Sequence, residues 1–218
     1  AHYTSPTVIK AIYEAVGNMG FQTGNILEPS MGVGNFFGCL PESMQGSKLY
    51  GVELDSITGR IAKQLYPQAN ITVAGFETTD RRDFYDLAIG NVPFGQYQVN
   101  DRAYNKLGFS IHNYFFAKAL DQVRPGGVIA FVTSRYTMDS KDSRQTVYCR
   151  ACRAAGRNSL AEQCVQSEYR NRCCVRYFVL AKTGAAKHRR TGVDAAWGKC
   201  GQIFHQQLLY PPPGNDSR

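Results

Sequence analysis

Short apolar runs alternate with amphipathic helical patterns through the first 133 residues, and this alternation restricts the fold more than any other feature of the chain. Strands that alternate with helices at this spacing favour an α/β fold with a doubly wound, mostly parallel sheet. Ligands bind such sheets beyond the carboxyl ends of the strands. The pattern predicts strands over residues 25–27, 48–52, 71–73, 85–89 and 128–132, and helices over 6–16, 57–65 and 112–123.

Charge and cysteine content divide the chain near residue 143. Residues 1–143 carry 12 Lys or Arg and 13 Asp or Glu, so 13 of the 25 basic residues but only 4 of the 17 acidic residues fall in residues 144–218. Six of the seven cysteines lie in that tail as well. A net charge of +8 ordinarily indicates a partner rich in phosphate. Here the excess belongs to the tail alone, so it is weak support for such a partner.

A glycine turn follows the first expected strand, within Ile26–Phe36. Gly32 and Gly34 let the backbone approach a ligand at positions where a Cβ would collide. Glu53 ends the next strand about twenty residues on, where a carboxylate can accept hydrogen bonds from both ribose hydroxyls. On these residues alone a nucleotide pocket, a flavin pocket and an ordinary tight turn all stay open.

A second segment, Asn91-Val92-Pro93-Phe94, closes the apolar run Leu87–Gly90. Strand-end turns that begin with Asn and contain Pro are also common in proteins without special chemistry. Together with the upstream glycine turn, however, this segment resembles the catalytic loop (Asn-Pro-Pro-Tyr/Phe) of the amino-group DNA methyltransferases, specifically the adenine-N6 enzymes. The resemblance covers residues 1–143 and implies a Rossmann-like methyltransferase fold with S-adenosylmethionine as cofactor.

The resemblance assigns catalytic roles to Asn91, Val92, Pro93 and Phe94. The exocyclic amine of adenine is a poor nucleophile, because its lone pair is delocalised into the ring. The Asn91 side-chain oxygen and the Val92 carbonyl can each accept one of its N–H groups, which positions the amine and stabilises the developing positive charge. Phe94 offers a face on which the flipped base can stack. Val92 stands where the family usually has proline, but it keeps the carbonyl.

The resemblance also implies which residues hold the cofactor. Glu28 matches an acidic residue beside S-adenosylmethionine, Thr4 belongs to a segment that approaches its methionine moiety, and Phe76 matches a residue near its adenine. Gly75 stands where the family often has an acid. The full expected set is Thr4, Glu28, Pro29, Ser30, Gly32, Gly34, Glu53, Leu54 and Phe76, and no metal is expected.

Longer motif matches narrow the resemblance to the methylase portion of very large helicase–methyltransferase proteins of phages, plasmids and other mobile elements. They include Glu28-Pro29-Ser30-Met31-Gly32, Tyr50–Asp55 and Phe131–Asp139. This implies DNA as substrate and a helicase region of the same larger polypeptide as partner. Two alternatives remain: an N-methyltransferase that acts on RNA or a protein amide, and a non-catalytic module that binds cofactor or DNA.

The tail supports three hypotheses. Cys149, Cys152, Cys173 and other residues could hold zinc, but the second half lacks a paired ligand motif. A basic nucleic-acid arm is the second, although Tyr177–Leu180 suits a solvated arm poorly. The third is a frameshift near Arg144: read one base later, Gly156–Thr183 gives a string ending Asp-Val-Val-Ser-Asp-Ile-Leu-Phe-Leu-Gln-Lys, which resembles the next segment of the family.

The frameshift hypothesis has consequences for the fold. We expect a methyltransferase domain over 1–143, incomplete at its end, and an out-of-frame tail over 144–218. The C-terminal antiparallel hairpin of the family would be missing or degraded, leaving an exposed apolar edge on the fifth strand that favours aggregation. No apolar run approaches the roughly 20 residues that a membrane span needs, so no membrane partner and a cytoplasmic location are expected.

Overall fold

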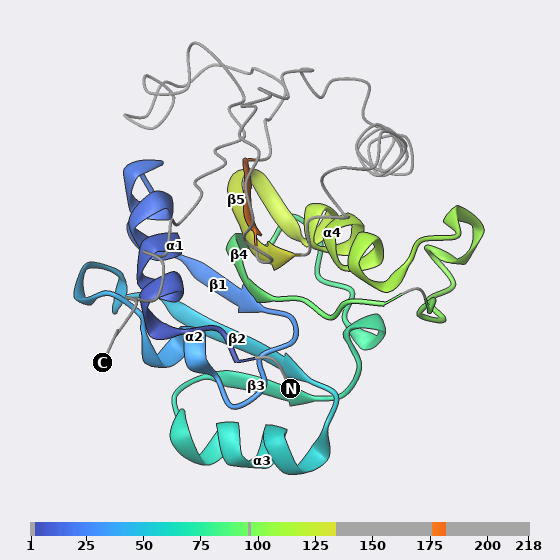
Figure 1. Ribbon diagram of the computed structural model, residues 1–218, viewed down its shortest axis with the longest axis horizontal. Helices are drawn as coiled ribbons and strands as arrows, with labels where there is room; N and C mark the ends of the chain where they lie inside the picture. Colours follow the sequence, from blue (N-terminus) through green and yellow to red (C-terminus); the bar gives the residue numbers. More distant parts are fainter. Residues whose placement is uncertain (1–2, 96, 134–175, 182–218) are drawn as a thin grey trace, which may run out of the picture.

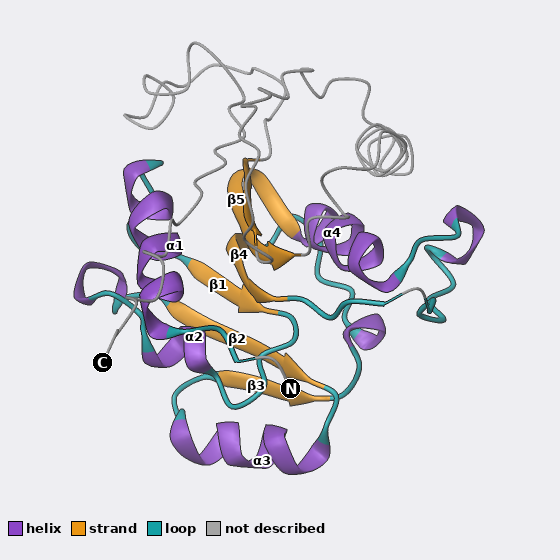
Figure 2. Ribbon diagram, viewed as in Figure 1, coloured by secondary structure: helices purple, strands orange, loops and turns teal. Residues whose placement is uncertain are grey.

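A six-stranded sheet with helices on both faces makes up the described part of the molecule (Figure 1, Figure 2). The strand order is β3-β2-β1-β4-β5-β6, and all neighbouring pairs are parallel except β5 and β6. This confirms the predicted doubly wound, mostly parallel α/β fold. The computed structural model describes residues 3–95, 97–133 and 176–181.

The bounds of the elements follow. The strands are β1 (Asn25–Glu28), β2 (Lys48–Glu53), β3 (Asn70–Val73), β4 (Tyr85–Asn91), β5 (Val123–Thr133) and β6 (Arg176–Ala181). The α-helices are α1 (Pro6–Asn18), α2 (Asn35–Gly38), α3 (Ser56–Leu65) and α4 (Ile111–Gln122). Three short 3₁₀ helices are η1 (Glu42–Met44), η2 (Phe76–Thr78) and η3 (Asn105–Leu107).

Helices α1 and α3 begin at the capping residues that the sequence predicts. The Ser5 hydroxyl accepts a hydrogen bond from the Val8 amide at 3.4 Å, and Pro6 occupies the first helical position. The Asp55 carboxylate accepts one from the Thr58 amide at 2.7 Å. These side chains satisfy amide groups that have no partner inside a helix.

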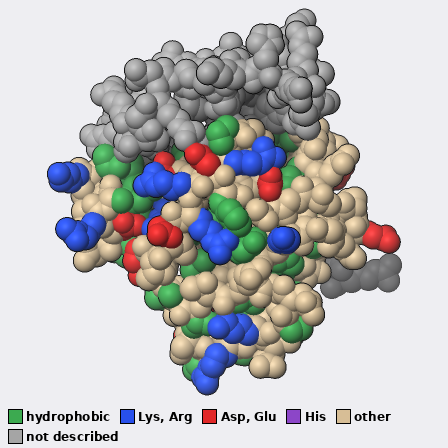
Figure 3. Space-filling view, turned by 180° about the vertical axis from the view of Figure 1, so that it is seen from behind, with side chains coloured by type: hydrophobic (Ala, Val, Ile, Leu, Met, Phe, Trp, Pro, Cys, Tyr) green, Lys and Arg blue, Asp and Glu red, His purple; other side chains and the backbone are tan. Residues whose placement is uncertain are grey.

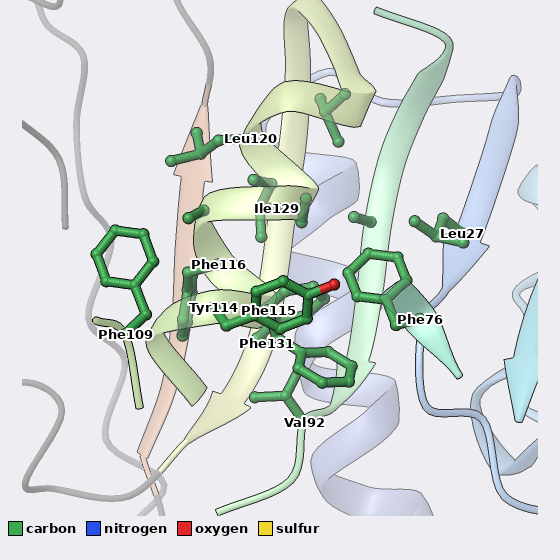
Figure 4. Packing of buried hydrophobic residues seen from close by; sticks show 14 of the residues in the cluster. Leu27, Phe76, Val92, Phe109, Tyr114, Phe115, Phe116, Leu120, Ile129 and Phe131 are labelled. Atoms are coloured by element: carbon green, nitrogen blue, oxygen red, sulfur yellow. The ribbon is translucent and has the colours of Figure 1, made fainter. Parts of the chain in front are cut away.

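The two faces of the sheet bury separate clusters, because successive strand residues point to opposite sides. Leu27 and Ala88 face α4 and join a cluster that includes its aromatic residues (Figure 4). Ile26 and Leu87 face α1. Helix α3 packs on the outer strand pair, where Ala62 joins a smaller cluster. The core therefore holds the central strands rigidly from both sides.

Strand β5 begins five residues earlier than the sequence predicts. Val123 pairs with Tyr85 and Val128 with Leu87, with a register shift between the two pairs. The irregularity absorbs Pro125-Gly126-Gly127, which the sequence pattern marks as a break between helix and strand. Helix α4 consequently ends at Gln122.

The expectation that β5 keeps an exposed edge is wrong for the carboxyl half of that strand, because one antiparallel strand of the hairpin expected to be missing or degraded, β6, follows it. Strand β6 pairs antiparallel with β5 from Val128↔Ala181 to Thr133↔Arg176. Residues 177–180 are aromatic, β-branched or leucine, which is a composition that favours strands. The six-residue ladder covers the edge of β5 along the carboxyl half of that strand. The cysteines proposed as zinc ligands lie outside the described residues.

Among the residues that the structure describes, no helix is both long and apolar enough to cross a membrane.

Candidate active site

The carboxyl ends of β1 and β4 lie side by side at the centre of the sheet (Figure 1). Leu27 pairs with Ala88, so the residues after each of them come together. A Cβ built on Gly90, whose φ is +153°, would lie 3.3 Å from Glu28 Cγ. The residue that precedes Asn91 therefore lies close to the side chain of the residue expected beside the cofactor.

The glycine turn after β1 uses two left-handed residues for different reasons. Gly34 has φ +86°, and a Cβ there would lie 2.4 Å from the Tyr66 ring, so close packing requires glycine. The Tyr66 hydroxyl also donates to the Gly34 carbonyl at 2.8 Å. Gly32 has φ +56°, but no atom of the described residues lies within 4 Å of its Cβ position. The open side of Gly32 leaves room for a ligand to approach the backbone.

Glu53, at the end of β2, holds the glycine turn in place. Its Oε2 accepts a hydrogen bond from the Gly32 amide and its Oε1 one from the Asp55 amide, both at 2.8 Å. Since an ionised carboxylate offers about four lone-pair sites, both oxygens can still accept ribose hydroxyls. The predicted ligand residue thus also links the turn to the cap of α3.

Glu28 is a buried carboxyl group. It is 1% exposed, and its Oε2 has no hydrogen-bond partner among the residues that the structure describes. Burial, reinforced by the negative charge of Glu53, raises the pKa of Glu28 well above its ordinary value. A buried oxygen of this kind fits a positively charged ligand group, which would favour the carboxylate form.

The Asn91–Phe94 loop begins at the end of β4. Its first residue, Asn91, lies opposite Val132 in the last pair of the β4–β5 ladder. The Val92 side chain is 1% exposed and joins the α4-side cluster with Phe131 (Figure 4). Its burial fixes the loop at the position where the loop motif that it resembles has a rigid proline. Phe94 is 39% exposed and so has a surface available for stacking.

The structure distributes the other expected cofactor residues unevenly. Pro29 is buried in the turn, whereas Ser30 and Thr4 are half-buried. Leu54 is 76% exposed. Phe76, at the start of η2, is 3% exposed and packs in the core against Phe115, with ring centroids 4.9 Å apart. The side chain of Phe76 is thus mainly a core residue.

Sequence reasoning missed a buried polar cluster beside the loop that follows Phe94. Lys118 of α4 contacts Asp101 at 2.7 Å, and the Tyr114 hydroxyl donates to the same carboxylate oxygen at 2.8 Å. The available signal was a lone lysine in the otherwise apolar helical run 114–120. A charged side chain within a buried helical run must find a buried partner.

Two curated proteins resemble parts of the chain. It is 31% identical over 137 residues to the "Defense against restriction protein B" of Escherichia phage P1, which covers 60% of this chain and 6% of the phage protein. It is 32% identical over 92 residues to the "Type II methyltransferase M.CvrRI" of Paramecium bursaria Chlorella virus XZ-6E, covering 42% and 24%. The chain therefore spans a small part of each relative. No family model matches.

Solved structures match a larger share of this chain than the two curated proteins do. A modification subunit of a putative type I restriction enzyme from Vibrio vulnificus YJ016 aligns with a TM-score of 0.57 and 16% identity, over 69% of this chain and 38% of that one. A putative class I S-adenosylmethionine-dependent methyltransferase from Listeria monocytogenes aligns with a TM-score of 0.52 and 18% identity, over 65% and 48%. The fold is that of the S-adenosylmethionine-dependent methyltransferases. Within this methyltransferase fold, both candidate loops lie at the carboxyl ends of the strands.

Proposed function

We propose that this chain transfers a methyl group from S-adenosylmethionine to the N6 amino group of adenine in DNA. The observation that carries the proposal is the closeness of Gly90 to Glu28, since a Cβ built on Gly90 would lie 3.3 Å from Glu28 Cγ, and this brings the Asn91–Phe94 loop near the buried side chain of Glu28. The viral relative is by name a type II methyltransferase, and a neighbour of like fold is a restriction-modification subunit. Both support DNA as substrate; neither name specifies the base.

The residues present fit the cofactor. The Glu28 oxygen without a partner among the described residues suits the positive charge of the cofactor. The open side of Gly32 allows the cofactor to approach the backbone closely, and the Glu53 carboxylate can accept hydrogen bonds from the ribose hydroxyls. When bound, S-adenosylmethionine supplies a methyl group on a sulfonium, with the thioether as leaving group. Thr4, Pro29, Ser30, Leu54 and Phe76 are proposed to complete the site.

The loop supplies positioning rather than proton abstraction, so the N6 nitrogen releases its surplus proton to water after the methyl group has been transferred. The Asn91 amide oxygen and the Val92 carbonyl would each accept one N–H of the adenine amine, which directs the nitrogen lone pair at the methyl group. The same two dipoles stabilise the positive charge that develops on nitrogen. Phe94 would stack on the base after it leaves the duplex.

The first test compares wild type with Asn91→Ala. Loss of one preorganised acceptor should lower the methylation rate of adenine in DNA by about 10² to 10³, while cofactor binding by calorimetry stays close to wild type. Asn70→Ala, at the amino end of β3, is the matched control and should keep full activity. Equal rates in Asn91→Ala and wild type would exclude the assigned role.

Substrate panels separate the alternatives. Labelled cofactor should transfer its methyl group to adenine in DNA rather than to RNA or to a protein amide. Binding of cofactor with no transfer to any of them would instead indicate a non-catalytic module.

We also propose the division into a methyltransferase domain over 1–143 and an out-of-frame tail over 144–218, and a helicase region elsewhere in a larger polypeptide as partner. The frameshift rests on the resemblance of the shifted string to the family. Determination of the underlying DNA sequence tests it directly: a second, longer frame should continue past Arg144. One uninterrupted frame that matches relatives through residue 218 would exclude it.

A further inference from the structure

A buried ion pair lies next to the candidate site and takes no part in the chemistry above. The side chains of Lys118 and Asp101 are 5% and 10% exposed, and Nζ lies 2.7 Å from Oδ2. The Tyr114 hydroxyl donates to the same oxygen at 2.8 Å. Although burial alone would raise it, these hydrogen bonds hold the pKa of Asp101 below its ordinary value. The carboxylate form of Asp101 is therefore favoured.

Lys118 joins three segments that are distant in the sequence. Besides Asp101, its ammonium donates to the Glu77 carbonyl of η2 at 3.0 Å. It lies 5.5 to 5.8 Å from the ring centroids of Phe76, Tyr104 and Tyr114, which is within the range of cation–π attraction. One charge thus connects η2, which follows β3, with the loop that follows Phe94 and with α4.

The loop that Asp101 belongs to is the continuation of the Asn91–Phe94 segment. The first turn of α4 holds its beginning, because the Ile111 amide donates to the Tyr97 carbonyl at 3.0 Å and His112 hydrogen-bonds to the Gly95 backbone. Asp101 holds its middle, since its Oδ1 accepts a hydrogen bond from the Ala103 amide at 3.1 Å. The position of Asn91–Phe94 therefore depends on anchors along α4.

We propose that Lys118 and Asp101 form a positioning pair for methyl transfer, which fixes the Asn91–Phe94 loop relative to the Phe76 side of the site. Stability alone does not require this pair, because well-packed apolar residues often replace a buried ion pair without loss. A charge held by three segments specifies one arrangement of them instead. The inference rests on the function proposed above.

The experiment compares wild type, Lys118→Met, Asp101→Asn and the double variant. Asparagine keeps the Oδ1 acceptor for Ala103, and methionine approximates the length of lysine. The control is Arg124→Met, which removes the basic partner of Asp86 at the opposite, amino end of the sheet. Three readouts are thermal unfolding, hydrogen exchange of the full chain with and without S-adenosylmethionine, and kcat and KM for methylation of DNA.

The double variant should keep a cooperative unfolding transition. Hydrogen exchange of peptides from 91–108 should rise at least about tenfold, and kcat should fall about 100-fold with KM for the cofactor within about threefold. Arg124→Met should show neither change. Because the two residues act as a unit, kcat should fall no further in the double variant than in either single variant.

Exchange and kcat that match those of Arg124→Met would overturn the proposal, as would a loss that appears only as a lower melting temperature. Exchange remains decisive if the wild-type chain methylates no DNA. In that case the proposed function fails, while faster exchange confined to 91–108 still supports the pair as the anchor of the loop, and unchanged exchange refutes it.

Discussion

Glu28 combines deep burial with a neighbouring carboxylate, and this makes the stability of the fold depend on pH. Its raised pKa means that the folded protein binds more protons than the unfolded chain above the ordinary value of 4.5. The free energy of unfolding should therefore fall as pH rises from there toward the raised pKa, with a slope of at most about 1.4 kcal/mol per pH unit from this one group.

Glu28→Gln tests this dependence, because glutamine cannot ionise. The free energy of unfolding of Glu28→Gln minus that of wild type should increase in urea titrations as pH rises from about 4.5 toward the raised pKa of Glu28. Glu14→Gln, which changes an exposed glutamate of α1, should leave the difference flat. A flat difference for Glu28→Gln as well would show that the carboxyl group is ionised at its ordinary pKa in the fold.

Two glycines of one turn should respond differently to alanine. Gly32→Ala should lower the free energy of unfolding by about 1 to 2 kcal/mol, because alanine disfavours the left-handed backbone. It should lower the affinity for the cofactor more than Gly34→Ala does, because the alanine side chain enters the open side of the turn. Gly34→Ala adds a clash with the Tyr66 ring and should destabilise the protein more than Gly32→Ala. Urea unfolding and calorimetric titration with cofactor measure the two effects, and the reverse order of stabilities would contradict this account.

At the scale of elements, β6 protects the edge of β5. Adjacent strand residues direct their amides to opposite sides, so Phe178→Pro with Val179→Pro removes at least one amide that faces β5. Exposure of the β5 edge should then increase aggregation, measured by light scattering at constant protein concentration. Thr183→Pro, beyond the end of β6, is the control. Equal scattering from both variants would mean that the ladder does not protect this edge.

Most elements could be predicted, because their signals are local. Asp55 before an amphipathic run marks the start of α3, and Gly32 with Gly34 marks the turn after β1. Strand β6 was missed, although its apolar run is visible, because its partner lies over forty residues away and the tail around it shows no period. The one-base shift reads Tyr177–Leu180 as Ile-Leu-Phe-Leu, so either frame gives an apolar strand here.

The candidate site was predictable only where a motif marks it. Asn91 and Glu28 belong to recognisable segments, and the parallel sheet brings their strand ends together. The Lys118–Asp101 contact joins residues seventeen positions apart with no shared motif. Nothing local shows that a loop aspartate turns inward, because this depends on how the chain folds between Phe94 and α4.

At the scale of the whole molecule, charge is unevenly shared between its parts. On the face shown in Figure 3, basic and acidic side chains are interspersed rather than gathered into one patch. Residues 144–218 carry 13 basic and 4 acidic residues of the totals of 25 and 17. Sequence-independent attraction to DNA should therefore come mainly from the tail.

Fluorescence anisotropy with non-specific duplex DNA tests this expectation. The affinity of the chain as written should fall steeply with salt between about 50 and 200 mM, because bound phosphates release counterions. The protein translated in the shifted frame after Arg144 should show a weaker dependence of DNA affinity on salt concentration. Equal slopes would place the DNA-binding charge within residues 1–143 instead.

The Glu28 carboxyl group at the glycine turn also restricts which nucleotides can enter. Glu28 lies where dinucleotide-binding folds present a bare glycine backbone to a pyrophosphate, whereas an acidic residue at the position of Glu53 is common to those folds. A sulfonium at this turn would favour the carboxylate form of Glu28, which burial otherwise disfavours, whereas a pyrophosphate would be repelled by that form and would gain no attraction from the neutral one. The same backbone shape that elsewhere accepts NAD or FAD is thereby made selective for a cation, and neither dinucleotide should compete for it.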